Sequence, residues 1–286
     1  MDKKKLDKLL KCIAFLVALF VFCVVVVWAK GYDKGTVTEY SVVCLGDSNL
    51  GNIQDETGIV NLLEQKLGTK VLNGAFGGST MANVNGVKTE YHSVLSMYNL
   101  ALSICNKNFG MQKSEIDVIM QSDHVKYFDV TLDKLSKVDF DSVDILIIEH
   151  GVNDYLSGTP IKNGSDPYDT ETFCGTLRTV ITMLREEYPN LRIVLSTPTY
   201  CAPIGAGWIN RYCDEVDYGG GLLEDYVNAE IEVAKELGVE IIDTYHLVNI
   251  HKDNVTEYLD DGLHLSQMGR EEVASLWADY LLGEGK

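Results

Sequence analysis

Short β-rich runs alternate with amphipathic segments along residues 31–286. Runs such as DILIIE and RIVLS are apolar at successive positions, which is typical of parallel strands that helices cover on both faces. The longer stretches between them space their apolar residues as one face of a helix does. We predict strands at Tyr40–Leu45, Lys70–Asn73, Asp144–His150, Arg192–Ser196 and Val239–Asp243, and helices at Ile59–Leu67, Val94–Cys105, Thr170–Tyr188, Leu222–Leu237 and Met268–Leu282.

This alternation predicts a fold class. A strand, a helix and a second strand in succession form a crossover that leaves the two strands parallel in one sheet. Repeated crossovers give a doubly wound α/β domain, in which helices cover both faces of the sheet. No internal repeat, charge block or long linker interrupts residues 31–286, so we predict one domain over this range.

The N-terminal segment has a different pattern. Residues 12–29 are eighteen consecutive uncharged residues, and a helix of that length spans roughly 27 Å, close to the hydrocarbon thickness of a bilayer. Five lysines precede the run, so the positive-inside rule predicts a cytoplasmic N-terminus. We therefore predict a cytoplasmic tail and single-pass anchor over residues 1–30, with an extracellular domain over 31–286. The alternative is secretion after signal-peptide cleavage, because Val27 and Ala29 are small enough to precede a cleavage site.

Charge excludes one class of partner. The whole chain has a net charge of −18, and residues 1–30 contribute +4, so residues 31–286 carry −22. Such an acidic surface repels phosphate backbones, which argues against nucleic-acid binding and against adsorption of the domain on an anionic membrane. A content of 46% hydrophobic and 23% charged residues also excludes a disordered protein.

Cysteine spacing gives no support for a metal site. Five cysteines lie beyond the apolar run, and no CxxC or Cys/His cluster with zinc spacing occurs. Cys201 and Cys213 bracket a glycine-containing loop, which leaves a disulfide between them open, whereas buried free thiols are favoured for most of the five.

The chain also lacks Gly-x-Gly-x-x-Gly and Walker motifs for nucleotides, and the Gly-x-Ser-x-Gly elbow of α/β-hydrolases.

Candidate chemistry lies just after the predicted strands, where the sites of parallel sheets gather. Ser48 lies in GDSN after the first strand, Gly78 in NGAFGG after the second, and Asn153 in GVND after the third. Asp261 and His264 lie in DGLH, before the last helix. Each motif alone is also typical of an ordinary turn or helix cap. Together, in this order, they place a nucleophile, hydrogen-bond donors and an Asp/His pair at one end of one sheet.

The four blocks resemble those of the SGNH hydrolase superfamily, the GDSL-type esterases and lipases, over roughly residues 40–282. The resemblance implies a three-layer α/β/α sandwich with a flavodoxin-like parallel sheet. It also implies a triad of Ser48, His264 and Asp261, and an oxyanion hole formed by the N–H groups of Ser48 and Gly78 and the Asn153 amide. Two positions depart from the family pattern: Asn49 stands where Leu is common, and Leu265 where Pro is frequent. Neither supplies chemistry, so the departures bear on substrate preference.

Acyl transfer is also consistent with these residue types. A serine hydroxyl becomes a good nucleophile when a neighbouring base removes its proton, and the imidazole of His264 titrates near neutrality. Asp261 would hold that ring in the required tautomer, and the three donors would stabilise the oxyanion. This chemistry requires no metal or organic cofactor. The remaining histidines are weaker candidates for the base: His92, His124, His150, His246 and His251.

For the substrate, we expect a short-chain ester, an acetyl ester above all, carried by an extracellular carbohydrate. The predicted location and the absence of an apolar lid-like segment favour this over a lipid. Aromatic residues between the fourth and fifth strands are candidates for stacking on sugars or for ordinary packing: Tyr200, Trp208, Tyr212 and Tyr218. The alternatives are a carbohydrate O-acyltransferase with the same triad, a lipase or lysophospholipase, and, less favoured, a non-catalytic binding protein.

Overall fold

Five parallel strands form the centre of the computed structural model, which describes residues 40–83, 91–119, 125–202 and 211–283. The strand order is β2-β1-β3-β4-β5, and every neighbouring pair is parallel. This is the doubly wound order of a flavodoxin-like sheet. The strands are β1 (Val42–Gly46), β2 (Val71–Asn73), β3 (Ile145–Glu149), β4 (Arg192–Ser196) and β5 (Glu240–Ile242).

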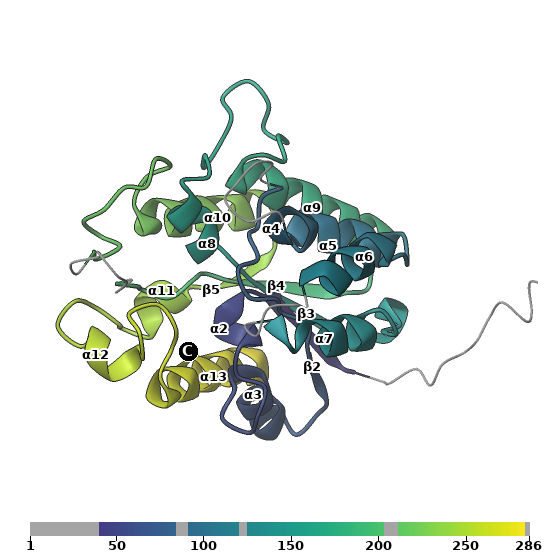
Figure 1. Ribbon diagram of the computed structural model, residues 1–286, viewed down its shortest axis with the longest axis horizontal. Helices are drawn as coiled ribbons and strands as arrows, with labels where there is room; N and C mark the ends of the chain where they lie inside the picture. The colour runs from purple at the N-terminus through teal and green to yellow at the C-terminus, as the bar shows by residue number, and fades with distance from the viewer. Residues whose placement is uncertain (1–39, 84–90, 120–124, 203–210, 284–286) are drawn as a thin grey trace, which may run out of the picture. The chain divides into compact units, whose positions relative to one another are not determined.

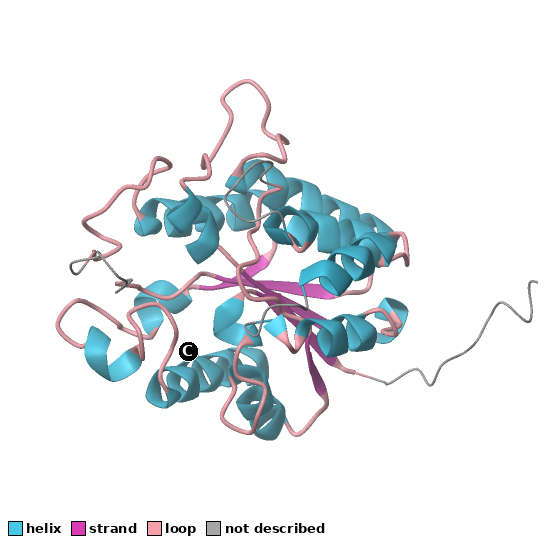
Figure 2. Ribbon diagram, in the orientation of Figure 1, coloured by secondary structure: helices cyan, strands magenta, loops and turns pink. Residues whose placement is uncertain are grey.

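Helices cover both faces of this sheet (Figures 1 and 2). On one face α5, α9 and α10 pack side by side, and on the other α3 packs against α13. The helices with the chain segments they span are α2 (Ser48–Gly51), α3 (Ile59–Leu67), α4 (Tyr91–Val94), α5 (Met97–Cys105), α6 (Gly110–Ile119), α7 (Phe128–Leu135), α8 (Val152–Ser157), α9 (Phe173–Glu187), α10 (Leu223–Leu237), α11 (Thr244–Leu247), α12 (Val255–Tyr258) and α13 (Gln267–Leu282), with a short 3₁₀ turn at Phe140–Ser142.

The core follows from the two periodicities of the sequence. All five residues of β1 are buried, as are four of the five in β3 and in β4, because helices cover both faces. In α9, Leu177, Ile181 and Leu184 are buried at helical spacing, and the Thr172 hydroxyl caps the helix by accepting from the Gly175 N–H. Full burial of one such large side chain stabilises the fold by roughly 1.5–3 kcal/mol.

All five predicted strands are confirmed, with ends that differ by no more than two residues. The predicted helix Val94–Cys105 is wrong at its start, because the Ser96 side chain accepts from the Asn99 N–H and begins α5 at Met97. Two longer helices were not predicted. In α7 the apolar spacing Phe128, Leu132 and Leu135 was available as a signal. In α6 only Gln112 and Ile116 are buried, so this helix has no apolar stripe to detect.

Two further sequence predictions concern the membrane segment and the cysteines. The predicted membrane segment, residues 12–29, lies outside the described residues, and within the ranges described above no helix is both long and apolar enough to cross a bilayer. The five cysteines beyond that segment are free thiols. Four of them are buried, and Cys201 and Cys213 are in contact, with the Cys201 N–H donating to Cys213 Sγ at 3.4 Å.

Candidate active site

Ser48 is the first residue of α2, directly after β1. The preceding Asp47 caps the helix by accepting from the Asn49 N–H at 2.9 Å. A first helical residue has no intrahelical acceptor for its own N–H, so the Ser48 N–H is available to a ligand. The register places Gly46 opposite Glu149, so the chain leaves β1 and β3 at the same level of the sheet. The serine is therefore presented at the carboxyl edge, beside the segment that follows β3.

A tight turn after β2 presents Gly78. The Ser79 N–H donates to the Phe76 carbonyl at 3.1 Å, and Gly78 has a φ of 75°, the positive value that a type II turn requires at this position. The Gly78 N–H donates to no acceptor within the described part of the chain. At the neighbouring Gly77, a Cβ would lie 3.6 Å from Ser48 Cβ. The turn thus lies beside Ser48, and the same Cβ would be crowded by Tyr127 Oη at 3.1 Å and Asn52 Oδ1 at 3.2 Å, which favours glycine at position 77.

Tyr127 anchors this turn from another part of the fold. Its hydroxyl accepts from the Gly77 N–H at 2.9 Å and donates to Asn52 Oδ1 at 3.1 Å. The residue precedes α7, and its ring packs edge-on against Phe128, with centroids 4.9 Å apart. One side chain therefore links the glycine turn to the end of α2.

Asn153, the second residue of α8, joins the segments that follow three strands. Its Nδ2 donates to Asp47 Oδ2 at 3.1 Å and to the Ser79 carbonyl at 3.0 Å. The adjacent Asp154 carboxylate is fully buried and accepts from the backbone N–H groups of residues 81 and 82, at 2.7 and 3.0 Å. Burial raises the pKa of Asp154 to about 7, against the lowering effect of these hydrogen bonds.

His264 and Asp261 lie on the loop before α13. His264 Nε2 is 3.0 Å from Ser48 Oγ, and His264 Nδ1 is 2.6 Å from Asp261 Oδ2. The other Asp261 oxygen accepts from the N–H groups of Leu263 and His264 at 2.9 and 2.7 Å. Burial alone would raise the pKa of Asp261, but the hydrogen bonds from His264 and Leu263 outweigh it and lower the pKa. The carboxylate consequently stays ionised at neutral pH.

Two buried carboxyl groups follow the strand ends at this edge of the sheet, Asp47 after β1 and Glu149 at the end of β3. Burial raises the pKa of Asp47 to about 6, while the Asn49 N–H, the His264 charge and the Asn153 amide act in the opposite direction. Burial, reinforced by Asp47 and Glu230, raises the pKa of Glu149 well above its usual range. Asp47 accepts from the Asn49 N–H and from the Asn153 amide, so its carboxyl group lies in direct contact with one of the predicted oxyanion donors.

The structure thus brings Ser48, His264 and Asp261 into one hydrogen-bonded row, with Asn153 and Gly78 beside it. Sequence reasoning assigned no role to Asp47, although the motif contained it. It also missed Tyr127, for which no sequence signal exists, because it contacts the site from fifty residues away. Asn49 was judged irrelevant to the chemistry, yet its side chain accepts from the Leu265 N–H.

Other residues considered from the sequence fall outside this row. His150 is fully buried, and burial lowers its pKa to about 4; the imidazole that contacts Ser48 Oγ is that of His264. Tyr200 is buried and donates to Asp214, which leaves no ring face for a sugar. Tyr218 packs edge-on against Tyr155. His246 and His251 are exposed, whereas Trp208, His124 and the side chain of His92 lie outside the described residues.

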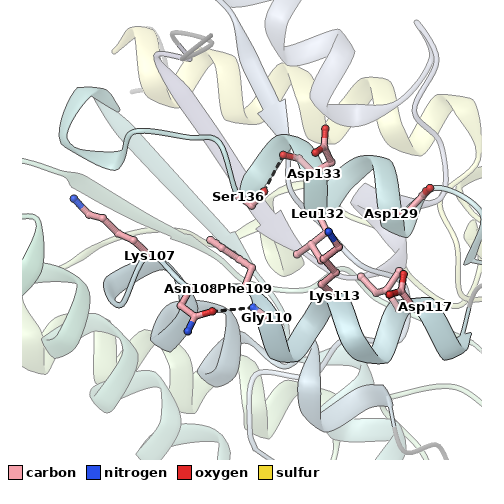
Figure 3. A pocket seen from close by; sticks show the side chains of 11 residues that line it. Lys107, Asn108, Phe109, Gly110, Lys113, Asp117, Asp129, Leu132, Asp133 and Ser136 are labelled. Carbon is pink, nitrogen blue, oxygen red and sulfur yellow. Dashed lines mark hydrogen bonds between the residues drawn. The ribbon is translucent and has the colours of Figure 1, made fainter. Parts of the chain in front are cut away.

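A hollow of about 480 Å³ between α6 and α7 lies apart from the triad (Figure 3). Lys107, Lys113, Asp117 and Asp129 line it. Ser136, the one serine that lines it, donates to the Asp133 carbonyl, and no histidine is among the lining residues. Within the described ranges, no three His, Cys, Asp or Glu side chains are grouped to hold a metal ion. The predicted nucleophile and the predicted base are in hydrogen-bond contact at Ser48 and His264, so we place the candidate active site there.

The family model for GDSL-like lipases and acylhydrolases matches residues 42–277. The chain belongs to this family. The matched range includes every residue of the hydrogen-bonded row, and the resemblance inferred from the sequence blocks is confirmed at this level.

Named relatives of this GDSL-family chain include the isoamyl acetate-hydrolyzing esterase 1 homologs of Bos taurus and Homo sapiens. They are 30% identical over 142 and 145 residues, which cover 48% of this chain and 55% and 56% of theirs. The chain therefore spans about half the length of the curated relatives it matches. The hydrolysis of isoamyl acetate in these names is an activity of the relatives.

Solved structures share the fold. A protein from Lactobacillus plantarum has a TM-score of 0.58 at 17% identity, covering 87% of this chain and all of its own. A carbohydrate acetylesterase from Sinorhizobium meliloti has a TM-score of 0.50 at 17% identity, covering 86% of this chain and 99% of its own. At such identities the similarity establishes the α/β fold with its central parallel sheet.

Proposed function

We propose that this GDSL-family protein is a serine esterase that hydrolyses short-chain acyl esters through an acyl-enzyme on Ser48. The observation that carries the proposal is the continuous row from Ser48 Oγ through the His264 ring to Asp261, with contacts of 3.0 and 2.6 Å. A serine whose proton can pass to an oriented imidazole is an activated nucleophile.

In the first half of the reaction, His264 Nε2 accepts the Ser48 proton while Oγ attacks the ester carbonyl. The negative charge that develops on the carbonyl oxygen is stabilised by the N–H groups of Ser48 and Gly78 and by the Asn153 amide. Both amide protons of Asn153 already have acceptors, Asp47 and the Ser79 carbonyl. The oxyanion therefore accepts a hydrogen bond from an Asn153 proton that is shared with Asp47 or with the Ser79 carbonyl.

Attack on the carbonyl gives a tetrahedral intermediate, and collapse of this intermediate completes the transfer of the acyl group. The imidazolium of His264 gives its proton to the leaving alcohol, and the acyl group remains bonded to Ser48 Oγ. A water molecule then attacks the acyl-enzyme, with His264 as its base, and the acid leaves with Ser48 restored. Asp261, whose pKa is lowered, stays ionised throughout and stabilises the imidazolium in both halves.

We assign a short acyl group, an acetyl group above all, and an acylated carbohydrate as the alcohol part. Support comes from the mammalian relatives, whose names refer to hydrolysis of an acetate ester, and from the Sinorhizobium structure, named a carbohydrate acetylesterase. The net charge of −22 on residues 31–286 is suited to a neutral sugar rather than an anionic lipid surface. kcat/KM should fall from acetyl to octanoyl esters; a steady rise would replace this assignment with a lipase.

We further propose that the enzyme acts outside the cell, anchored through residues 12–29. The support is the uncharged run and the lysine cluster before it. External protease on intact cells should remove the domain and leave a short N-terminal peptide. Recovery of the protein uncut would refute the location, and release of a shortened protein into the medium would favour a cleaved signal peptide.

The decisive experiment compares Ser48→Ala with wild type and with Ser165→Ala, which removes an exposed serine on a distant loop. We expect the full chain and Ser165→Ala to hydrolyse p-nitrophenyl acetate and to be labelled by a fluorophosphonate. Ser48→Ala should show background turnover and no label. Wild-type activity in Ser48→Ala, or label on another residue, would refute the proposal. A sugar acceptor that raises consumption of the ester and yields acylated sugar would reassign the enzyme as an acyltransferase.

A further inference from the structure

One hydrogen bond connects the residue after the nucleophile with the residue after the base. The Leu265 N–H donates to Asn49 Oδ1 at 3.2 Å, and both residues are buried. We call Gly46–Asn49, Gly77–Ser79 and Asn153 the nucleophile half of the site, and Asp261–Leu265 the base half. Beside the Ser48–His264 contact itself, this bond ties the two halves directly.

The backbone at Leu265 is arranged so that Asn49 is the acceptor for its N–H. Leu265 pairs with Leu259 in an isolated antiparallel bridge. The hydrogen bonds of this bridge use neighbouring residues instead: the Asp260 N–H donates to the His264 carbonyl, and the Ser266 N–H to the Tyr258 carbonyl. On its other side, the Leu265 carbonyl accepts from the Arg270 guanidinium at 2.6 Å. The bridge therefore leaves the Leu265 N–H free for the Asn49 side chain.

The bond needs an acceptor in the side chain at position 49 and a backbone N–H at position 265. A leucine at 49 would offer no acceptor, and a proline at 265 would offer no N–H. Either change alone would leave a buried polar group without its partner, whereas both together would remove the donor and the acceptor at once. Positions 49 and 265 thus depend on each other through this bond.

We propose that Asn49 is a positioning residue for the reaction, acting through Leu265 on His264. Its side-chain carbonyl holds the end of the base half, at Leu265, against α2, and this sets the distance from His264 Nε2 to Ser48 Oγ. The inference rests on the proposed function. It predicts an effect on the chemical step, because a displacement of about 1 Å at the reacting groups can cost about 10²-fold in rate.

The first test is Asn49→Leu in the full chain, with p-nitrophenyl acetate as substrate. We expect kcat to fall by about 10- to 100-fold with KM changed by less than about threefold, and the labelling of Ser48 by a fluorophosphonate to slow by a similar factor. Asn99→Leu is the matched control, since Asn99 also bonds through its amide but lies on α5. It should lower the Tm without slowing the labelling.

The second test is a double-mutant cycle with Leu265→Pro, using Leu265→Ala to measure the loss of packing alone. The double variant Asn49→Leu/Leu265→Pro should be no slower than the slower single variant, because each change removes the same bond. Should Leu265→Pro fail to fold, Asn49→Asp decides: it keeps an oxygen acceptor and should retain more kcat than Asn49→Leu.

Three results would overturn the inference: an unchanged labelling rate in Asn49→Leu, effects of the two single changes that multiply in the double variant, or equal loss of kcat in Asn49→Asp and Asn49→Leu. These outcomes differ from failure of the proposed function. If the esterase proposal itself is wrong, the wild-type chain will not be labelled at Ser48.

Discussion

The nucleophile half lies at buried strand ends, whereas the base half is a short loop whose two polar side chains, those of Asp261 and His264, are partly exposed to solvent. The Ser48 residue is 9% exposed, while the side chains of His264 and Asp261 are 33% and 53% exposed. In the nucleophile half, Asn153 bonds to residues after β1 and β2, so its geometry needs three strands in register. In the base half, Asp261 bonds to residues two and three positions away.

From this difference we expect substitutions in one half to destabilise the fold and substitutions in the other to affect the reaction alone. Exposed hydrogen bonds within a loop add little to global stability, so variants of Asp261 and His264 should stay folded while losing turnover. The polar groups of the nucleophile half are buried, and removing one leaves its partner without compensation. Variants there should lose stability as well as activity.

The largest effect is expected for His264→Ala. Turnover should fall by roughly 10⁴- to 10⁶-fold, because the residues of a triad act as a unit. The comparison predicts an unchanged Tm, since the ring is part-exposed. Kinetics of the single variant and of Ser48→Ala/His264→Ala check this, and the double variant should be no slower than the single. A further large drop in the double variant would show that the two side chains act independently.

Asp261→Asn should cost roughly 10⁴-fold, since an amide cannot both accept from the loop N–H groups and stabilise the imidazolium. The pKa of Asp261 is lower in the folded protein than in the unfolded chain, where it is about 3.8. The ionised carboxylate therefore contributes to stability above pH 3.8, and this contribution is lost as the pH falls through the folded-state pKa. Thermal melts between pH 2 and 7 should therefore converge for variant and wild type at low pH. A gap that widens on acidification would contradict this assignment.

Asn153→Ala should lower kcat by about 10²- to 10³-fold with KM little changed, the usual cost of one oxyanion donor. Unlike the variants of the base half, it should also lower the Tm, because the buried Asp47 carboxylate loses a donor. Steady-state kinetics with differential scanning fluorimetry measure both effects. Equal melting temperatures for Asn153→Ala and His264→Ala would remove the contrast between the halves.

The smallest effect is expected for Tyr127→Phe. Loss of the hydroxyl deprives the Gly77 N–H of its acceptor, at a cost of about 0.5–1.5 kcal/mol, which corresponds to at most about tenfold in kcat. Tyr168→Phe is the control, since Tyr168 is exposed on a distant loop. If Tyr127→Phe and Tyr168→Phe have the same kcat, the glycine turn does not depend on this anchor.

Prediction from sequence succeeded where information is local. The five strands carry continuous apolar runs, and Asp261 and His264 are close enough in the chain for one loop to hold both. It failed where the signal is weak or distant. No apolar stripe marks α6, and nothing near Tyr127 indicates that its hydroxyl contacts Gly77. The register of Gly46 with Glu149, which aligns the segments after β1 and β3, is likewise not encoded in either strand alone.

The sequence by itself determined the α/β fold class, the order of the four blocks and the residue types that acyl transfer needs, because periodicity and turn chemistry act over a few neighbouring residues. The tertiary structure alone decided the contact of His264 with Ser48, the pKa of Asp47 and the partnership of Asn49 with Leu265. These depend on burial and on distances between residues as many as 216 positions apart, which only the packed sheet and its helices define.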